Sequence, residues 1–214
     1  MTTFKNIKIT KTARYFITGS PSSNIKTVWF VLHGYGQRAD EFIKYFKPLK
    51  NETSLIIAPE ALNRFYLRGF NGNVGAAWMT KEERGNEIID YVNYLDSVYD
   101  EVIRYSQLSR VKINIIGFSQ GAATACRWIS ENNSRIDRLI LWGGEIPKDV
   151  DLDSLGKSLG VSGIEFVLGD KDEFISEDQL EGEAGRLQKN KLNYKIYRFN
   201  GKHEIKGEVL RQLI

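Results

Sequence analysis

Residues 117–121 read Gly-Phe-Ser-Gln-Gly, with a glycine two positions before and two positions after the serine. In a G-x-S-x-G nucleophile elbow the serine occupies a sharp turn from a strand to a helix, where only small neighbours avoid clashes. An apolar run at 113–116 precedes this motif and a helical pattern at 119–129 follows it, as the elbow requires. The pattern predicts Ser119 as a nucleophile for acyl transfer; the alternative is a glycine-lined turn without chemistry.

A nucleophilic serine needs a base, because its hydroxyl attacks poorly while it keeps its proton. In hydrolases with this elbow, the chain order is serine, then acid, then histidine. The chain has two histidines, His33 and His203, and only His203 follows Ser119. We therefore predict His203 as the base and expect His33 to brace its own loop through hydrogen bonds.

The third member of such a triad is an acid that holds the imidazole in the correct tautomer. It should follow a strand that lies between the serine and the histidine. The apolar run at 164–168 ends in a segment with three acidic residues, Asp170, Asp172 and Glu173. Spacing alone leaves all three as candidates.

Residues 32–37 read Leu-His-Gly-Tyr-Gly-Gln and follow another apolar run, at 28–32. Glycines here allow the backbone to turn an amide toward the nucleophile. In this type of site, that amide and the one after the serine bind the developing oxyanion. We predict that the N–H groups of Tyr35 and Gln120 form the oxyanion hole.

Short, almost wholly apolar runs predict the strands that must position these residues. Such runs are typical of parallel strands that are buried on both faces. Helical patterns alternate with the runs, and this alternation predicts one α/β domain over 1–214 with a mostly parallel sheet covered by helices on both faces. An antiparallel pair is expected at 4–9 and 13–17. The other expected strands are 28–32, 55–58, 113–116, 139–142, 164–168 and 194–199, and the expected helices are 80–103 with a capping box at its start, 119–129, a stretch after 177, and 204–214.

Two connections bear on the substrate. The segment between 142 and 164 is too short for a cap domain, which predicts an open site for a neutral or weakly polar ester of short to medium acyl chain. The long segment 60–77 is expected to lack regular secondary structure and to form one wall of the acyl pocket. The alternative is a packed loop whose aromatic side chains only fill its own interior. We predict Phe65 and Tyr66 of this segment as substrate-binding residues.

Composition excludes several other classes. The chain of 214 residues is 42% hydrophobic and 27% charged, which is ordinary for a globular protein, and it shows no secretory signal or run long enough to span a bilayer. One cysteine, Cys126, and two histidines argue against a disulfide or a zinc site. A net charge of +3 without a basic block argues against nucleic-acid binding. We expect a cytoplasmic protein without stable membrane insertion.

The motifs at 32–36, 117–122, 169–172 and 202–203 resemble those of the phospholipase/carboxylesterase family, which includes acyl-protein thioesterases and small bacterial carboxylesterases. The resemblance runs from about residue 27 to the C-terminus and implies an α/β-hydrolase fold without a large cap. It selects Asp172 as the acid, because the family's acid is the second aspartate of G-D-x-D. It also implies His203 as base, Tyr35 as an oxyanion donor and Trp78 as a residue near the acyl site.

This resemblance implies hydrolysis of a small-molecule ester or thioester through an acyl-enzyme, with no metal or organic cofactor. An acylated protein or a lysophospholipid are alternative substrates. The chain departs from the family at Glu173, at Glu145 and in the Met-Thr-Lys that follows Trp78, and these departures bear on the substrate. A non-catalytic binding protein of the same fold is the alternative class, and the intact Ser119, Asp172 and His203 argue against it.

Overall fold

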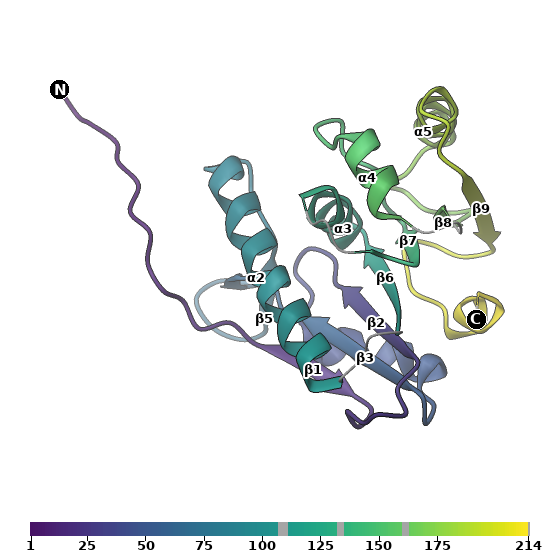
Figure 1. The fold of residues 1–214 in the computed structure, drawn as a ribbon. Helices are drawn as coiled ribbons and strands as arrows, with labels where there is room; N and C mark the ends of the chain where they lie inside the picture. The colour runs from purple at the N-terminus through teal and green to yellow at the C-terminus, as the bar shows by residue number, and fades with distance from the viewer. Residues whose placement is uncertain (107–110, 132–134, 160–162, 214) are drawn as a thin grey trace.

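The computed structural model describes residues 1–106, 111–131, 135–159 and 163–213. Within them one seven-stranded sheet has the order β1-β3-β2-β6-β7-β8-β9 (Figure 1). All neighbours in it are parallel except β1, which runs antiparallel to β3. The mostly parallel sheet is therefore confirmed. Its strands are β1 (Tyr15–Thr18), β2 (Thr27–Leu32), β3 (Ser54–Pro59), β6 (Lys112–Phe118), β7 (Arg138–Trp142), β8 (Ile164–Gly169) and β9 (Tyr194–Phe199).

Helices cover both faces of this sheet because successive strand side chains point to opposite faces. Along β2, Phe30 and Leu32 enter one apolar cluster, and Trp29 and Val31 enter the other. The first cluster is closed by α2 (Arg84–Ser106), α3 (Gln120–Glu131), α4 (Leu152–Ser158) and α5 (Glu177–Lys189), and the second by α1 (Ala39–Phe42), η1 (Ile43–Leu49) and α6 (Gly207–Gln212).

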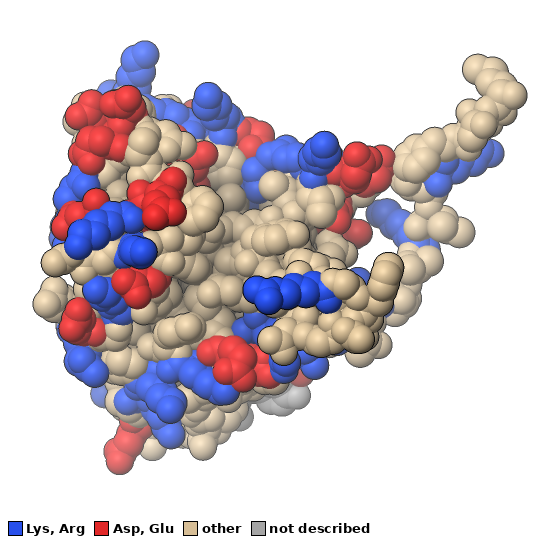
Figure 2. Space-filling view, turned by 180° about the vertical axis from the view of Figure 1, so that it is seen from behind, with Lys and Arg blue, Asp and Glu red and all other residues tan. Residues whose placement is uncertain are grey.

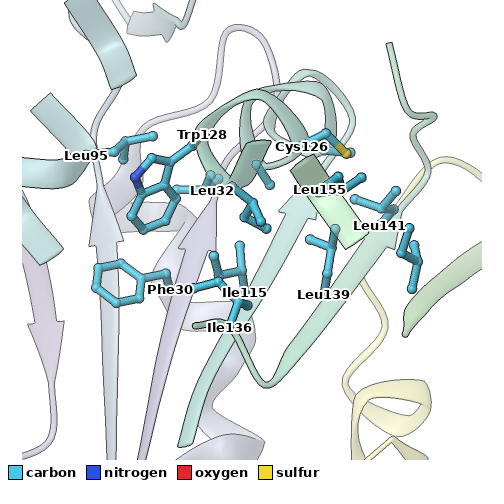
Figure 3. Packing of buried hydrophobic residues seen from close by; sticks show 14 of the residues in the cluster. Phe30, Leu32, Leu95, Ile115, Cys126, Trp128, Ile136, Leu139, Leu141 and Leu155 are labelled. Carbon is cyan, nitrogen blue, oxygen red and sulfur yellow. The ribbon is translucent and has the colours of Figure 1, made fainter. Parts of the chain in front are cut away.

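The first cluster holds the nucleophile helix onto the sheet. Trp128 of α3 is 1% exposed and meets the Phe30 ring edge-on at 5.3 Å. Cys126 and Leu155 extend the same layer over Leu139 (Figure 3). Burying large side chains of this kind stabilises a fold by about 1.5–3 kcal/mol each. The start of α3, which Ser119 directly precedes, is thus anchored by the core beneath it.

Charged residues lie mostly at the periphery of one face of the molecule. Figure 2 shows lysine, arginine, aspartate and glutamate side chains mixed along its edges, around an uncharged centre. None of the described helices combines the length and apolarity needed to cross a bilayer.

The expected antiparallel pair at the N-terminus is wrong. Residues 1–14 form no strand, and the N-terminal stretch of them leads away from the domain (Figure 1), with Phe4, Ile7 and Ile9 exposed. β1 pairs with β3 instead, with Phe16 opposite Ala58. An isolated two-stranded hairpin is marginal in water, whereas β3 offers a buried edge.

The segment 60–77, expected to lack regular structure, contains a two-stranded sheet of β4 (Asn63–Tyr66) and β5 (Val74–Ala77). We call 63–77 the β4–β5 hairpin. It packs on the loop after β2, because Gly36 N–H donates to Ala76 O at 2.9 Å and Ala76 N–H donates to Gln37 O at 3.2 Å. A side chain at Gly75 would overlap the carbonyl oxygen of Gly36.

Two expected helix ends also differ. α2 begins at Arg84, four residues after Thr80, because the Thr80 hydroxyl accepts a hydrogen bond from Glu82 N–H in a local turn and Glu83 has a φ of +48°. The last helix covers 207–212 rather than 204–214, whose final residue lies outside the described part of the chain. The short elements α1, η1, α4, β4 and β5 were not expected.

Candidate active site

The topology brings the predicted site residues to one edge of the sheet. Ser119 directly follows β6, the loop 33–38 follows β2, Asp172 lies beyond β8 and His203 lies beyond β9. These four strands are parallel, so their carboxyl ends meet at the same edge. Ligands of open α/β sheets bind at this edge.

Ser119 occupies a strained turn. Its φ of +53° lies in the left-handed region, which non-glycine residues adopt rarely and chiefly at functional sites. Its N–H donates to Trp142 O at 2.9 Å, and its own carbonyl accepts from Ala122 N–H at 2.9 Å. A Cβ at Gly117 would overlap the backbone at Gly121, so the sharp turn requires glycine there. Ser119 is partly exposed, and its hydroxyl forms no hydrogen bond with the described residues.

His203 and Asp172 are hydrogen-bonded through Nδ1 and Oδ2 at 2.8 Å. The other carboxylate oxygen of Asp172 accepts from Phe174 N–H at 2.9 Å and Ile175 N–H at 3.3 Å, and the Asp172 side chain is only 2% exposed. Because the Asp172 carboxylate accepts this hydrogen bond, Nδ1 of His203 carries the ring proton. Nε2 then keeps its lone pair and can accept a proton. The two rival acids, Asp170 and Glu173, are exposed.

The His203 ring is held on several sides. Phe118 and Phe174 lie 4.8 Å and 4.6 Å from it, centroid to centroid. Gly143, which has a φ of +57°, leaves the space that the ring occupies, because a Cβ there would lie 2.9 Å from both Cε1 and Nδ1. No role for Gly143 was predicted from the sequence, where the available signal is the Gly-Gly pair directly after 139–142.

The loop after β2 lies against the serine. A Cβ at Gly34 would lie 3.2 Å from the Cβ of Ser119. Gly34 N–H donates to the Gln37 side chain at 2.8 Å and Gly36 N–H to Ala76 O at 2.9 Å. In contrast, the N–H of Tyr35 has no acceptor among the described residues, and neither does the N–H of Gln120 at the start of α3. Both amides predicted for the oxyanion hole are thus free to donate to a ligand oxygen.

His33 braces this loop from inside the protein. It is fully buried, its Nδ1 donates to Gly34 O at 2.8 Å, and its Nε2 accepts from Ala61 N–H at 3.0 Å. Burial lowers the pKa of His33 below its ordinary value, so the ring stays neutral. Because both ring nitrogens are engaged, His33 has no free site to act as a base.

The three predicted substrate-binding residues differ in position. Tyr66 is exposed on the β4–β5 hairpin, and the half-buried Phe65 lies 5.3 Å from the Tyr35 ring. Trp78 is only 1% exposed; its indole N–H donates to His33 O at 2.8 Å, and its backbone N–H donates to Gln120 Oε1 at 3.0 Å. This burial leaves Trp78 almost no surface for a substrate and makes it a brace of the oxyanion loop.

A cavity of about 340 Å³ opens beside the loop after β2. It is lined by Gly36, Arg38, Glu41, Leu67, Asn73 and Val74. In the part of the chain that the structure describes, no three histidine, cysteine, aspartate or glutamate residues are placed to hold a metal ion. Cys126 is buried, and burial raises the pKa of its thiol, so it is an inert core residue.

Comparisons with known proteins identify the family and the fold. Residues 13–214 match the sequence model described as Phospholipase/Carboxylesterase. Among solved structures, the Bacillus cereus carboxylesterase is 15% identical with a TM-score of 0.70, over 94% of this chain and 91% of that one. The Zea mays acyl-protein thioesterase 2 is 16% identical with a TM-score of 0.69, over 94% of this chain and 96% of that one. Esterase PE8 is 19% identical with a TM-score of 0.66, over 94% and 99%.

No curated protein sequence matches the chain. The solved structures, all at low identity, support the α/β-hydrolase fold, and the sequence match spans nearly the whole chain. The protein belongs to the phospholipase/carboxylesterase family of α/β-hydrolases.

Proposed function

We propose that this single-domain protein is a serine hydrolase that cleaves carboxylic esters or thioesters through an acyl-enzyme on Ser119. The observation that carries the proposal is the 2.8 Å hydrogen bond between Asp172 and His203 at the same sheet edge as the strained Ser119. A histidine oriented in this way has a basic Nε2, which is what a serine hydroxyl needs for activation.

The first half of the reaction forms the acyl-enzyme. The substrate carbonyl oxygen lies between the N–H groups of Tyr35 and Gln120. Ser119 Oγ forms a bond to the carbonyl carbon while its proton passes to His203 Nε2, and the carbonyl electron pair moves onto the oxygen. The two amides stabilise that charge, together with the N-terminus of α3. When the carbonyl reforms, the bond to the leaving oxygen or sulfur breaks and His203 returns the proton to it.

The second half releases the acid. Water attacks the acyl carbon as His203 takes one of its protons, and the bond to Ser119 Oγ then breaks as His203 protonates that oxygen. The acid leaves and Ser119 is restored. Throughout, Asp172 keeps the proton on Nδ1 of His203 and stabilises the charged ring.

For the substrate, we propose a neutral or weakly polar acyl group of short to medium chain on a small-molecule ester or thioester. The connection between β7 and β8 has only α4 among its described residues, so it holds no cap domain. The cavity beside Gly36 is lined by Leu67 and Val74 of the β4–β5 hairpin together with the charged Arg38 and Glu41. An open site without a cap supports a short chain rather than a long one.

A chain-length series of p-nitrophenyl esters, with matched thioesters, tests the proposal in wild type and Ser119→Ala. We expect kcat/KM to peak at short to medium chains, and we expect kcat to fall by about 10⁴-fold or more in the variant. Near-normal hydrolysis by Ser119→Ala would exclude the serine mechanism. A kcat/KM that still rises at about fourteen carbons would contradict the proposed chain length. A wild-type protein inactive on the whole series would favour a binding protein.

A further inference from the structure

The loop between β2 and α1, residues 33–38, must hold the Tyr35 N–H in place for the proposed reaction. Its first end is held by His33, as described above. Its second end is held by a carboxylate from a different part of the chain: Glu60 Oε2 accepts a hydrogen bond from Ala39 N–H at 3.3 Å. Glu60 directly follows β3 and is only 2% exposed in its side chain.

A buried carboxylate requires a partner, because an isolated charge in the protein interior is strongly destabilising. Arg14 supplies it. The Nε and Nη2 of Arg14 each lie 2.7 Å from Glu60 Oε1. The two backbones are also joined, since Glu60 N–H donates to Arg14 O at 3.1 Å and Tyr94 OH donates to the same oxygen at 2.6 Å.

The two carboxylate oxygens of Glu60 therefore contact different parts of the chain. Oε1 neutralises its charge against Arg14, and Oε2 holds the start of α1 at Ala39. The next residue, Ala61, donates its N–H to Nε2 of His33. Residues 60 and 61 thus contact both ends of the loop 33–38, and Tyr35 lies between those contacts.

We propose that Glu60, fixed by Arg14, is a positioning residue for the oxyanion hole. It touches neither the substrate nor the reacting atoms; it holds the loop so that Tyr35 N–H faces Ser119. This inference rests on the proposed function for its kinetic consequence, but its structural consequence, a loop ordered by Glu60, does not depend on activity.

Glu60→Gln is the sharpest perturbation, because it keeps the side-chain shape. Arg14 and Ala39 N–H contact different oxygens of Glu60, and glutamine has an NH₂ donor in place of one of them, so it cannot accept at both positions. Loss of one oxyanion donor lowers kcat by roughly 10²–10³-fold. A displaced donor should lower it by less, about 10–100-fold. Ground-state binding does not depend on that donor, so KM should stay within about threefold.

The chain offers a matched control. Glu165 of β8 is 4% exposed and accepts from Arg138 Nε at 2.5 Å and Nη2 at 2.7 Å, so it is also a buried carboxylate in an arginine fork. It lies four residues before the end of β8, about 13 Å from the catalytic edge at 3.3 Å per residue. Glu165→Gln should destabilise the fold similarly but leave kcat within about twofold.

The experiment measures kcat, KM, thermal midpoint and backbone amide exchange of residues 33–39 in wild type, Glu60→Gln and Glu165→Gln. We expect lower kcat and faster exchange of this segment in Glu60→Gln alone. Equal loss of kcat in both variants, or unchanged exchange of 33–39 in Glu60→Gln, would overturn the inference. An inactive wild type would refute the proposed function, and the exchange comparison would still judge the role of Glu60.

If Glu60→Gln fails to fold, Arg14→Lys tests the same inference through kcat and the amide exchange of residues 33–39. One ammonium keeps the charge but cannot reproduce the two-nitrogen fork of arginine. We expect the same direction of change in kcat and in exchange, with a smaller size. A folded Arg14→Lys without either change would overturn the inference.

Discussion

Gly143→Ala should impair the base although it replaces none of the proposed triad residues. The added methyl would lie 2.9 Å from both Cε1 and Nδ1 of His203 and 3.3 Å from Asp172 Oδ2. Ordinary contacts between such atoms begin at about 3.5 Å, so the ring must move by roughly half an ångström or more. This displacement acts directly on the 2.8 Å hydrogen bond to Asp172 and on the position of Nε2. Since a misplacement of about 1 Å can lower a rate 10²-fold, we expect kcat to fall about 10–100-fold.

The substitution also strains the backbone, because Gly143 has a φ of +57°. Alanine in that conformation costs about 1–2 kcal/mol, which corresponds to a thermal midpoint lower by about 2–8 °C in a chain of this size. Gly69→Ala controls for strain: its φ is +58° and no atom lies within 4 Å of the added methyl. Steady-state ester hydrolysis and thermal unfolding of both variants form the assay. If Gly143→Ala and Gly69→Ala lose stability equally and both keep wild-type kcat, the reasoning about the His203 ring is refuted.

Three further predictions concern the histidines and the acid. His203→Ala should lower kcat about as much as loss of the serine, whereas His33→Ala should lower it roughly 10–10³-fold by releasing the oxyanion loop. The reverse ranking in the ester assay would refute the assignment of the base. Burial lowers the pKa of His33 below 6.5, so below that pH the unfolded chain binds a proton at His33 that the folded chain does not bind. The free energy of unfolding should therefore fall on acidification below pH 6.5, by up to about 1.4 kcal/mol per pH unit. This part of the slope should vanish in His33→Ala, which denaturant titrations at about pH 7.5 and pH 5.5 would check, and an equal slope in both proteins would contradict it. Asp172→Asn should lower kcat by about 10⁴-fold and Asp170→Asn by less than about twofold in the same ester assay, and equal losses would show that the acid was misassigned.

The parts of the site that depend on local pattern could be predicted from the sequence. The nucleophile elbow is such a part: an apolar strand, a serine between glycines and a helical pattern follow one another within 113–129. The parallel strands were recognisable for the same reason, because burial on both faces leaves uninterrupted apolar runs. Chain order then separated His203 from His33.

The parts that depend on contacts distant in the chain could not be predicted. The space at Gly143 matters only because a histidine 60 positions later occupies it, and Glu60 acts on a loop more than 20 positions earlier. Trp78 is predicted from the sequence to contact the substrate, yet its indole is buried and donates a hydrogen bond to His33 O. The N-terminal alternation at 4–9 predicted a strand, but strand pairing needs a partner edge, and β1 already covers that of β3.

Covalent labelling of the intact protein tests the central claim most directly. A fluorophosphonate reacts with a serine only when a base activates it and an oxyanion hole receives the phosphonyl oxygen. We predict that intact-mass and peptide mass spectrometry find one adduct per wild-type chain, on Ser119, and none on Ser119→Ala. An unlabelled wild-type protein, or an equal adduct on the Ser119→Ala variant, would contradict the account.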